Sequence, residues 1–236
     1  MTCSSQWGTG SRSRLLAVCL CFSLIIFLRQ ASVPANSPGP ILRIEEDWSL
    51  EISEPSTDDT SPQIINTISP TTNLNGQFAI FEINHATQPA YDDGGLELQI
   101  RNGSSLVDYK RSSDLSRLNN AGEIVTYTLA MSIQNSQSDG NGRQLRFSVK
   151  NGVSETWGTF GANSSLRCTT PYTNLLDFGG YSPDFSVNNS KIGYASFRVQ
   201  KYAMVAVRYY DANGLVSTDS TERVAFKYDP KAVISE

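Results

Sequence analysis

Apolar and polar residues alternate with a period of two in one segment after another from residue 42 onward. The longest of these segments is 124–133, in which Val125, Tyr127, Leu129, Met131 and Ile133 take every second position. Successive side chains of a strand point to opposite faces of a sheet, so this pattern is typical of a half-buried strand. No segment after the N-terminal region has the 3.6-residue period of an amphipathic helix, and the chain is therefore predicted to be all-β.

Turn-forming residues separate the alternating segments. Asn102-Gly103 predicts a hairpin between 96–101 and 106–111, and Asn151-Gly152 predicts a second hairpin that leads into 153–160. Further alternating segments are 42–52, 78–83, 145–149, 203–209 and 224–228. About ten strands with this spacing favour two packed antiparallel sheets, a β-sandwich of the jelly-roll or concanavalin-like lectin type.

Residues 1–35 differ from the rest of the chain. Arg12 and Arg14 precede an uncharged apolar run, 15–28, which is too short to cross a bilayer as a helix and is typical of a signal peptide. Val33 and Ala35 place the cleavage site before Asn36. The sequence predicts export to the periplasm, cell envelope or medium; the alternative is an uncleaved N-terminal anchor, which would be the only membrane contact. Residues 36–236 are predicted to form one domain.

A Pro-, Ser- and Thr-rich stretch at about 53–76 interrupts the alternating pattern. Pro55, Pro62 and Pro70 lie within it, and proline cannot donate a hydrogen bond to a strand ladder. We therefore expect a long surface connector here.

The charge balance argues against nucleic acid as a partner. The formal net charge of the chain is -4, and three of the 19 basic residues but none of the 23 acidic ones precede Asn36, which leaves residues 36–236 at -7. An acidic domain without a basic run repels a phosphate backbone.

The cysteines predict a domain without a disulfide. Cys3, Cys19 and Cys21 lie in the segment expected to be removed, so residues 36–236 retain Cys168 alone. Because Cys168 shares a strand face with Leu166, we interpret it as a buried, unreactive thiol.

The composition excludes many catalytic sites. His85 is the single histidine, at the end of an expected strand, so histidine metal clusters are excluded and any catalytic triad would have to use it. Glu45 and Asp47 share a strand face about 6.6 Å apart and could divide the acid and nucleophile roles of glycoside hydrolysis. Sandwich glucanases carry E-x-D-x-E on one strand, but Ser49 stands in the third place here. The other interpretation is a solvated outer face.

Two loops offer oxygen ligands for calcium, the only cofactor that the sequence suggests. Asp92 and Asp93 lie in one loop and Asp139 in another, and clustered oxygens are what a hard cation requires. Neither loop matches an EF-hand, and both also fit plain turns.

Aromatic residues give the candidates for ligand binding. Tyr172, Phe178, Tyr181 and Phe185 lie in a stretch rich in Gly, Asn and Pro, where exposed rings could stack on sugars; core packing is the alternative. Trp157 is predicted to be a buried anchor at a strand end.

Three motifs carry a resemblance to a group of proteins. They are 44–48 (IEEDW), 151–161 (NGVSETWGTFG) and Gly193-Tyr194 followed by Arg198-Val199. The chain resembles exported all-β proteins of bacteria with complex envelopes that share the N-G-x-S-x-T-W-G-x-F-G pattern and have no known activity. The resemblance implies one exported domain beginning near Ile41. The predicted function is an exported binding or envelope-structural module, with carbohydrate or an envelope protein as its partner; the alternative is a sandwich-type glycoside hydrolase.

Overall fold

Thirteen strands make up most of the part of the chain that the computed structural model describes. The described residues are 39–53, 62–71, 74–84, 95–112, 118, 120–135, 142–170, 173–183, 185 and 190–229. All of them belong to the unit Asn36–Glu236. The strands are β1 (Arg43–Ile52), β2 (Gln63–Ile68), β3 (Gln77–Asn84), β4 (Gly95–Asn102), β5 (Ser105–Arg111), β6 (Ile124–Asn135), β7 (Arg143–Ser154), β8 (Gly158–Phe160), β9 (Arg167–Thr169), β10 (Lys191–Tyr194), β11 (Val199–Asp211), β12 (Gly214–Asp219) and β13 (Arg223–Lys227). Two short 3₁₀ helices, η1 (Ala162–Ser164) and η2 (Ser196–Arg198), connect some of them.

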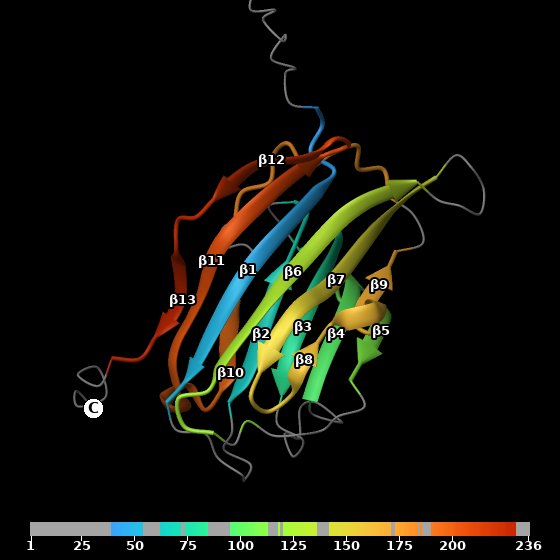
Figure 1. Cartoon of the computed structure of the whole chain (residues 1–236). Helices are drawn as coiled ribbons and strands as arrows, with labels where there is room; N and C mark the ends of the chain where they lie inside the picture. Colours follow the sequence, from blue (N-terminus) through green and yellow to red (C-terminus); the bar gives the residue numbers. More distant parts are fainter. Residues whose placement is uncertain are drawn as a thin grey trace, which may run out of the picture. The chain divides into compact units, whose positions relative to one another are not determined.

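The strands form two antiparallel sheets. Sheet A has the order β12-β11-β1-β6-β7-β8, with β13 paired to β11 and β9 paired to β7. Sheet B has the order β10-β2-β3-β4-β5. In Figure 1 the long strands β11, β1, β6 and β7 of sheet A lie in front of β2, β3 and β4 of sheet B. The prediction of an all-β antiparallel sandwich is confirmed.

The core lies between the two sheets and follows the alternation in the sequence. On β1 the inward side chains Ile44, Trp48, Leu50 and Ile52 are buried. The two sheets meet where Phe81 of sheet B packs edge-on against Tyr127 of sheet A, with 4.9 Å between ring centroids. Each fully buried Leu, Ile or Phe is worth about 1.5–3 kcal/mol relative to exposure, so this core can hold the domain without a disulfide.

A chain of polar side chains also crosses the core. Asn66 of β2 donates to the Tyr127 hydroxyl at 3.0 Å, which in turn lies 3.0 Å from the Tyr202 hydroxyl. The Ser190 hydroxyl donates to the side-chain oxygen Oδ1 of Asn66 at 2.9 Å. Buried polar groups are tolerated when they are hydrogen-bonded, and these contacts also fix one sheet against the other.

The expectation of a surface connector over 53–76 is wrong for its middle part. Residues 63–68 form β2, which lies between β10 and β3 and is buried at all six positions. Its apolar residues occur on both faces, which conceals the period of two. Pro62 and Pro70 flank the strand instead of interrupting it, and proline is tolerated there because no ladder donor is needed. Residues 54–61 and 72–73 lie outside the described residues.

The predicted hairpin at Asn102-Gly103 is confirmed, whereas the one at Asn151-Gly152 is wrong. Asn102 pairs with Ser105 across the first turn. At the second place β7 continues to Ser154, and the chain turns over the next three residues before β8. Asn151 has a φ of 54° beside a register shift between β6 and β7, so the dipeptide forms a β-bulge. Gly152 is required because a Cβ there would overlap the Phe160 ring.

The described residues contain no helix that is long and apolar enough to span a membrane. The predicted signal peptide, 1–35, lies outside them, so its cleavage remains a prediction.

Candidate functional site

The two carboxylates singled out in the sequence lie on the outer face of sheet A and share one arginine. Nη2 of Arg208, on β11, donates to Asp47 Oδ1 at 2.8 Å and to Glu45 Oε2 at 3.2 Å. Lys150 of β7 donates to the second oxygen of Glu45, and the Tyr210 hydroxyl donates to Oε2 at 2.9 Å. Every carboxylate oxygen of Glu45 is therefore held by a cation or a hydroxyl.

These contacts do not fit the hydrolase alternative. Burial by itself would raise the pKa of Glu45, but the hydrogen bond and charge of Lys150, with Tyr210 and Arg43, outweigh it and lower the pKa. A general acid needs a raised pKa so that it holds a proton near neutral pH. The interpretation of this row as a solvated face is also wrong at Glu45, whose exposed fraction is 4%.

Beside this cluster lies a pocket of about 310 Å³ with an unusual lining, which we call the cationic hollow. Four basic side chains surround it: Arg43 of β1, Arg146 and Lys150 of β7, and Arg167 of β9. The rest of the lining is small or uncharged: Ala130, Ser132, Gln134, Ser148, Val149, Gly161 and Ser164.

The strand register explains why the hollow forms. One row across sheet A places Ser132 between Arg43 and Arg146, and the next row places Ala130 and Ser148 before Arg167. Cross-strand neighbours on one face lie about 4.5–5.5 Å apart at Cβ, so small side chains at the centre leave space that long side chains at the edge enclose. The loop that carries η1 supplies the remaining wall. It crosses close to β7 at Gly161, which has a φ of 75° and no room for a Cβ against the Val149 carbonyl.

The basic side chains of the hollow are only partly neutralised. Arg43 Nε lies 3.2 Å from Glu45 Oε1, within ion-pair distance but without hydrogen-bond geometry, and Lys150 pairs with the same carboxylate. Arg146 and Arg167 have no acidic partner among the described residues. Nε of Arg146 is buried without a hydrogen bond there, and burial together with the charge of Arg167 lowers its pKa. Arg167 is exposed and Arg146 is partly buried, and a partly buried guanidinium group without an acidic partner is a site at which an anion would be stabilised.

A second pocket, of about 300 Å³, opens on the same face, and we call it the polar hollow. Its lining is Asp47, Trp48, Thr126, Tyr127, Thr128, Asn151, Val205 and Arg208. The side-chain amide of Asn151 donates to Thr128 at 3.3 Å, and the Thr128 hydroxyl donates to Asp47 at 2.7 Å. Trp48 and Tyr127 turn their rings into the core, so the hollow presents mainly hydroxyl, amide and charged groups.

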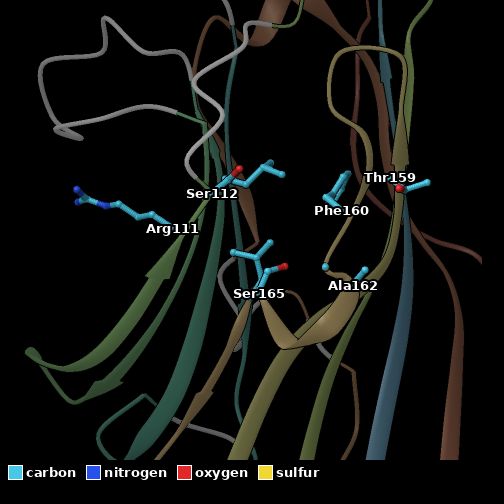
Figure 2. A pocket seen from close by; sticks show the side chains of 9 residues that line it. Arg111, Ser112, Thr159, Phe160, Ala162 and Ser165 are labelled. Atoms are coloured by element: carbon cyan, nitrogen blue, oxygen red, sulfur yellow. The ribbon is translucent and has the colours of Figure 1, made fainter.

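A third pocket, of about 320 Å³, lies where β4 and β5 approach the β8–η1 segment. Figure 2 shows Phe160 pointing into the space between Ser112 and Ser165, whereas Arg111 points away from it. Arg111 instead pairs with Glu97. Without a charged side chain directed inward, this pocket has less to orient a ligand than the cationic hollow.

The aromatic residues predicted to bind a ligand are mostly structural. Phe178 is buried, with an exposed fraction of 2%, so it cannot stack on a sugar. Tyr181 donates a hydrogen bond to the buried Glu46, and Phe185 packs against Trp48 with 5.5 Å between ring centroids. Tyr172 lies outside the described residues.

Trp157 and Cys168 lie where the sequence placed them. Trp157 belongs to the hydrophobic core, with an exposed fraction of 9%. Cys168 is buried, and burial, together with the nearby Asp108, raises the pKa of its thiol to about 12. Such a thiol is a poor nucleophile near neutral pH.

The predicted calcium ligands Asp92, Asp93 and Asp139, and also His85, lie outside the described residues. Within the described part of the chain, no three His, Cys, Asp or Glu side chains are grouped so that they could hold a metal ion.

Sequence reasoning did not find the arginines of the cationic hollow. Arg146 and Arg167 are 21 positions apart in sequence, and only the pairing of β7 with β9 brings them together. The sequence contains a weaker signal. Arg146 lies between Leu145 and Phe147 in an expected strand, so its side chain is on the face opposite to theirs.

Comparisons with known proteins give no relative: no protein-family model, no curated protein and no solved structure matches the chain.

Proposed function

We propose that the protein is an exported binding module and that the cationic hollow on the outer face of sheet A binds an anionic group of its ligand. The observation that carries the proposal is the unbalanced charge of Arg146 and Arg167. Two guanidinium groups on neighbouring strands repel one another, and a bound carboxylate, sulfate or phosphate would remove that repulsion.

The shape of the hollow supports the same function. All four of its basic residues lie on paired strands of sheet A, so the site is largely formed before a ligand arrives. The floor of serine side chains offers hydroxyl donors in addition to the charges. A binding site requires no catalytic group. The Glu45 and Asp47 carboxylates are paired with Arg208, so they do not compete with a ligand anion for Arg146 and Arg167.

The test is titration of the full chain with inorganic sulfate by calorimetry at low ionic strength. We expect saturable binding that weakens as salt is raised, since exposed charges are screened within about 10 Å at 0.1 M. Replacing both unpaired arginines, Arg146→Gln with Arg167→Gln, is expected to abolish it. Lys227→Gln, which removes one positive charge from β13 at the far edge of sheet A, is the matched control and should bind as the wild type does.

Two results would overturn the proposal. One is the absence of any sulfate binding by the wild-type chain. The other is equal binding by the wild type and the double arginine variant, with circular dichroism showing that both are folded.

A further inference from the structure

We propose that the cationic hollow and the polar hollow together bind one acidic oligosaccharide that lies along the strands of sheet A. This inference rests on the proposed function and adds the class of ligand. The acidic substituent of one sugar would enter the cationic hollow, and a neutral, hydroxyl-rich unit of the same chain would enter the polar hollow.

The two hollows are aligned with the strands. Arg43 lines the cationic hollow and Asp47 the polar hollow, and both lie on the outer face of β1. They are four residues apart, which is about 13 Å along a strand at roughly 3.3 Å per residue. On β7 the two linings are adjacent, with Lys150 in one and Asn151 in the other. An extended polymer can therefore reach both hollows without leaving the face.

The surface between the hollows does not repel an anionic chain. Glu45, the acid located there, is covered by Lys150 and Arg208 and has an exposed fraction of only 4%. The two linings and Glu45 together contain five basic side chains and two acidic ones. In a chain with a net charge of -4, this face is locally positive.

The chemistry of the polar hollow favours sugar hydroxyls. The amide nitrogen of Asn151 donates to Thr128, which leaves the side-chain oxygen of Asn151 to accept a hydrogen bond from a ligand hydroxyl. Thr126 is exposed and adds a hydroxyl, and Val205, with an exposed fraction of 37%, adds an apolar surface against which a sugar ring can lie. Hydroxyls and planar amides act as donor and acceptor, as sugar hydroxyls require.

Single-stranded nucleic acid fits this face less well. Its binding depends on aromatic side chains that stack on bases, and the two aromatic residues in the lining, Trp48 and Tyr127, are buried in the core.

The experiment measures the affinity of the full chain for five probes: inorganic sulfate, an oligogalacturonate, a sulfated galactan oligosaccharide, cellohexaose and an oligo-dT strand. We expect the better of the two acidic oligosaccharides to bind at least tenfold more tightly than sulfate, and cellohexaose and oligo-dT to bind less tightly than either. Whichever acidic oligosaccharide binds better identifies the acidic group, carboxylate or sulfate ester.

Variants of the polar hollow separate the two sites. Asn151→Gly removes the amide and keeps the left-handed backbone, and Thr126→Val removes a hydroxyl with little change of shape. One hydrogen bond is worth about twofold to tenfold in affinity, so the double variant should lose about tenfold in affinity for the acidic oligosaccharide. Its affinity for sulfate should stay unchanged. If Asn151→Gly fails to fold, Thr126→Val alone should still lose at least twofold.

The outcomes distinguish this inference from the proposed function. If no anion binds, both are wrong. If sulfate binds but the acidic oligosaccharides bind no more tightly than sulfate, the cationic hollow binds anions but the inference of an extended ligand is wrong. The same conclusion follows if the polar-hollow variants prefer the acidic oligosaccharide over sulfate as strongly as the wild type does. Binding of cellohexaose or oligo-dT as tight as that of the acidic oligosaccharides also overturns this inference.

Discussion

Glu46 is predicted to make the protein less stable as the pH rises through neutrality. Its side chain on β1 is fully buried, and it accepts hydrogen bonds from Trp48 Nε1 at 3.0 Å and from the Tyr181 hydroxyl. Burial raises its pKa from 4.5 to about 7, although both hydrogen bonds oppose the shift. The native state therefore keeps a proton that the unfolded chain loses above pH 4.5, and the free energy of unfolding falls with pH over that window.

The magnitude follows from the shift. One unit of pKa corresponds to about 1.36 kcal/mol, so ionising Glu46 in the native state costs about 3 kcal/mol once the pH is above 7. Glu82 adds to the same trend, since burial and the neighbouring charge of Glu97 raise its pKa to about 8. In Glu46→Gln the residue cannot ionise, and its carbonyl oxygen still accepts one hydrogen bond. The variant should be more stable than the wild type at pH 8 by about 3 kcal/mol.

The assay is urea unfolding at intervals between pH 4.5 and pH 9, with the free energy of unfolding plotted against pH for each protein. The matched control is Glu51→Gln, on the same strand but only partly buried, which should retain the wild-type profile. A Glu46→Gln profile as steep as that of the wild type would refute the reasoning. So would a variant that is less stable than the wild type at pH 8.

Three further predictions concern packing. Trp157→Ala should cost about 3–5 kcal/mol because it empties part of the core, and a thermal melt with an unchanged midpoint would contradict the burial of this ring. Gly152→Ala should lower the melting temperature because its Cβ meets the Phe160 ring, whereas Gly180→Ala, which has open space around it, should melt as the wild type does. The thiol of Cys168 should not react with Ellman's reagent at pH 8 in the native state: wild type and Cys168→Ala should give equal thiol counts before unfolding, and counts that differ by one after it.

Much of the fold could be predicted because the alternation of apolar and polar residues indicates which face of a strand is buried. β1 and β6 were recognised in this way, since each has one face against the core. The same pattern does not reveal β2, because all six of its positions are buried and Asn66 occupies a core position through hydrogen bonds. The prediction of a hairpin at Asn151-Gly152 is wrong because an Asn-Gly pair with a positive φ can either turn the chain or form a bulge, and the local sequence is the same in both cases.

The candidate site was less predictable than the fold. Glu45 and Asp47 were noticed because they are neighbours on one strand, but what decides their chemistry is Arg208, which is 163 residues from Glu45 in the sequence. The cationic hollow likewise depends on the pairing of β1, β6, β7 and β9. Tertiary packing sets the register between strands that are distant in the sequence, and local sequence patterns do not predict that register.

The position of β1 in sheet A also has a consequence for how the domain folds. The first strand of the sheet lies between β6 and β11, so one of its two ladders must wait for residues near the C-terminal end. Closing so long a loop costs conformational entropy before the contacts between β1 and β11 can form. Chains with many such long-range contacts fold slowly, in milliseconds to seconds. Until β11 arrives, β1 has an open edge available to other chains. A truncation in β11 before Arg208 would therefore expose an aggregation-prone edge of β1 and also remove the arginine that pairs with Glu45 and Asp47.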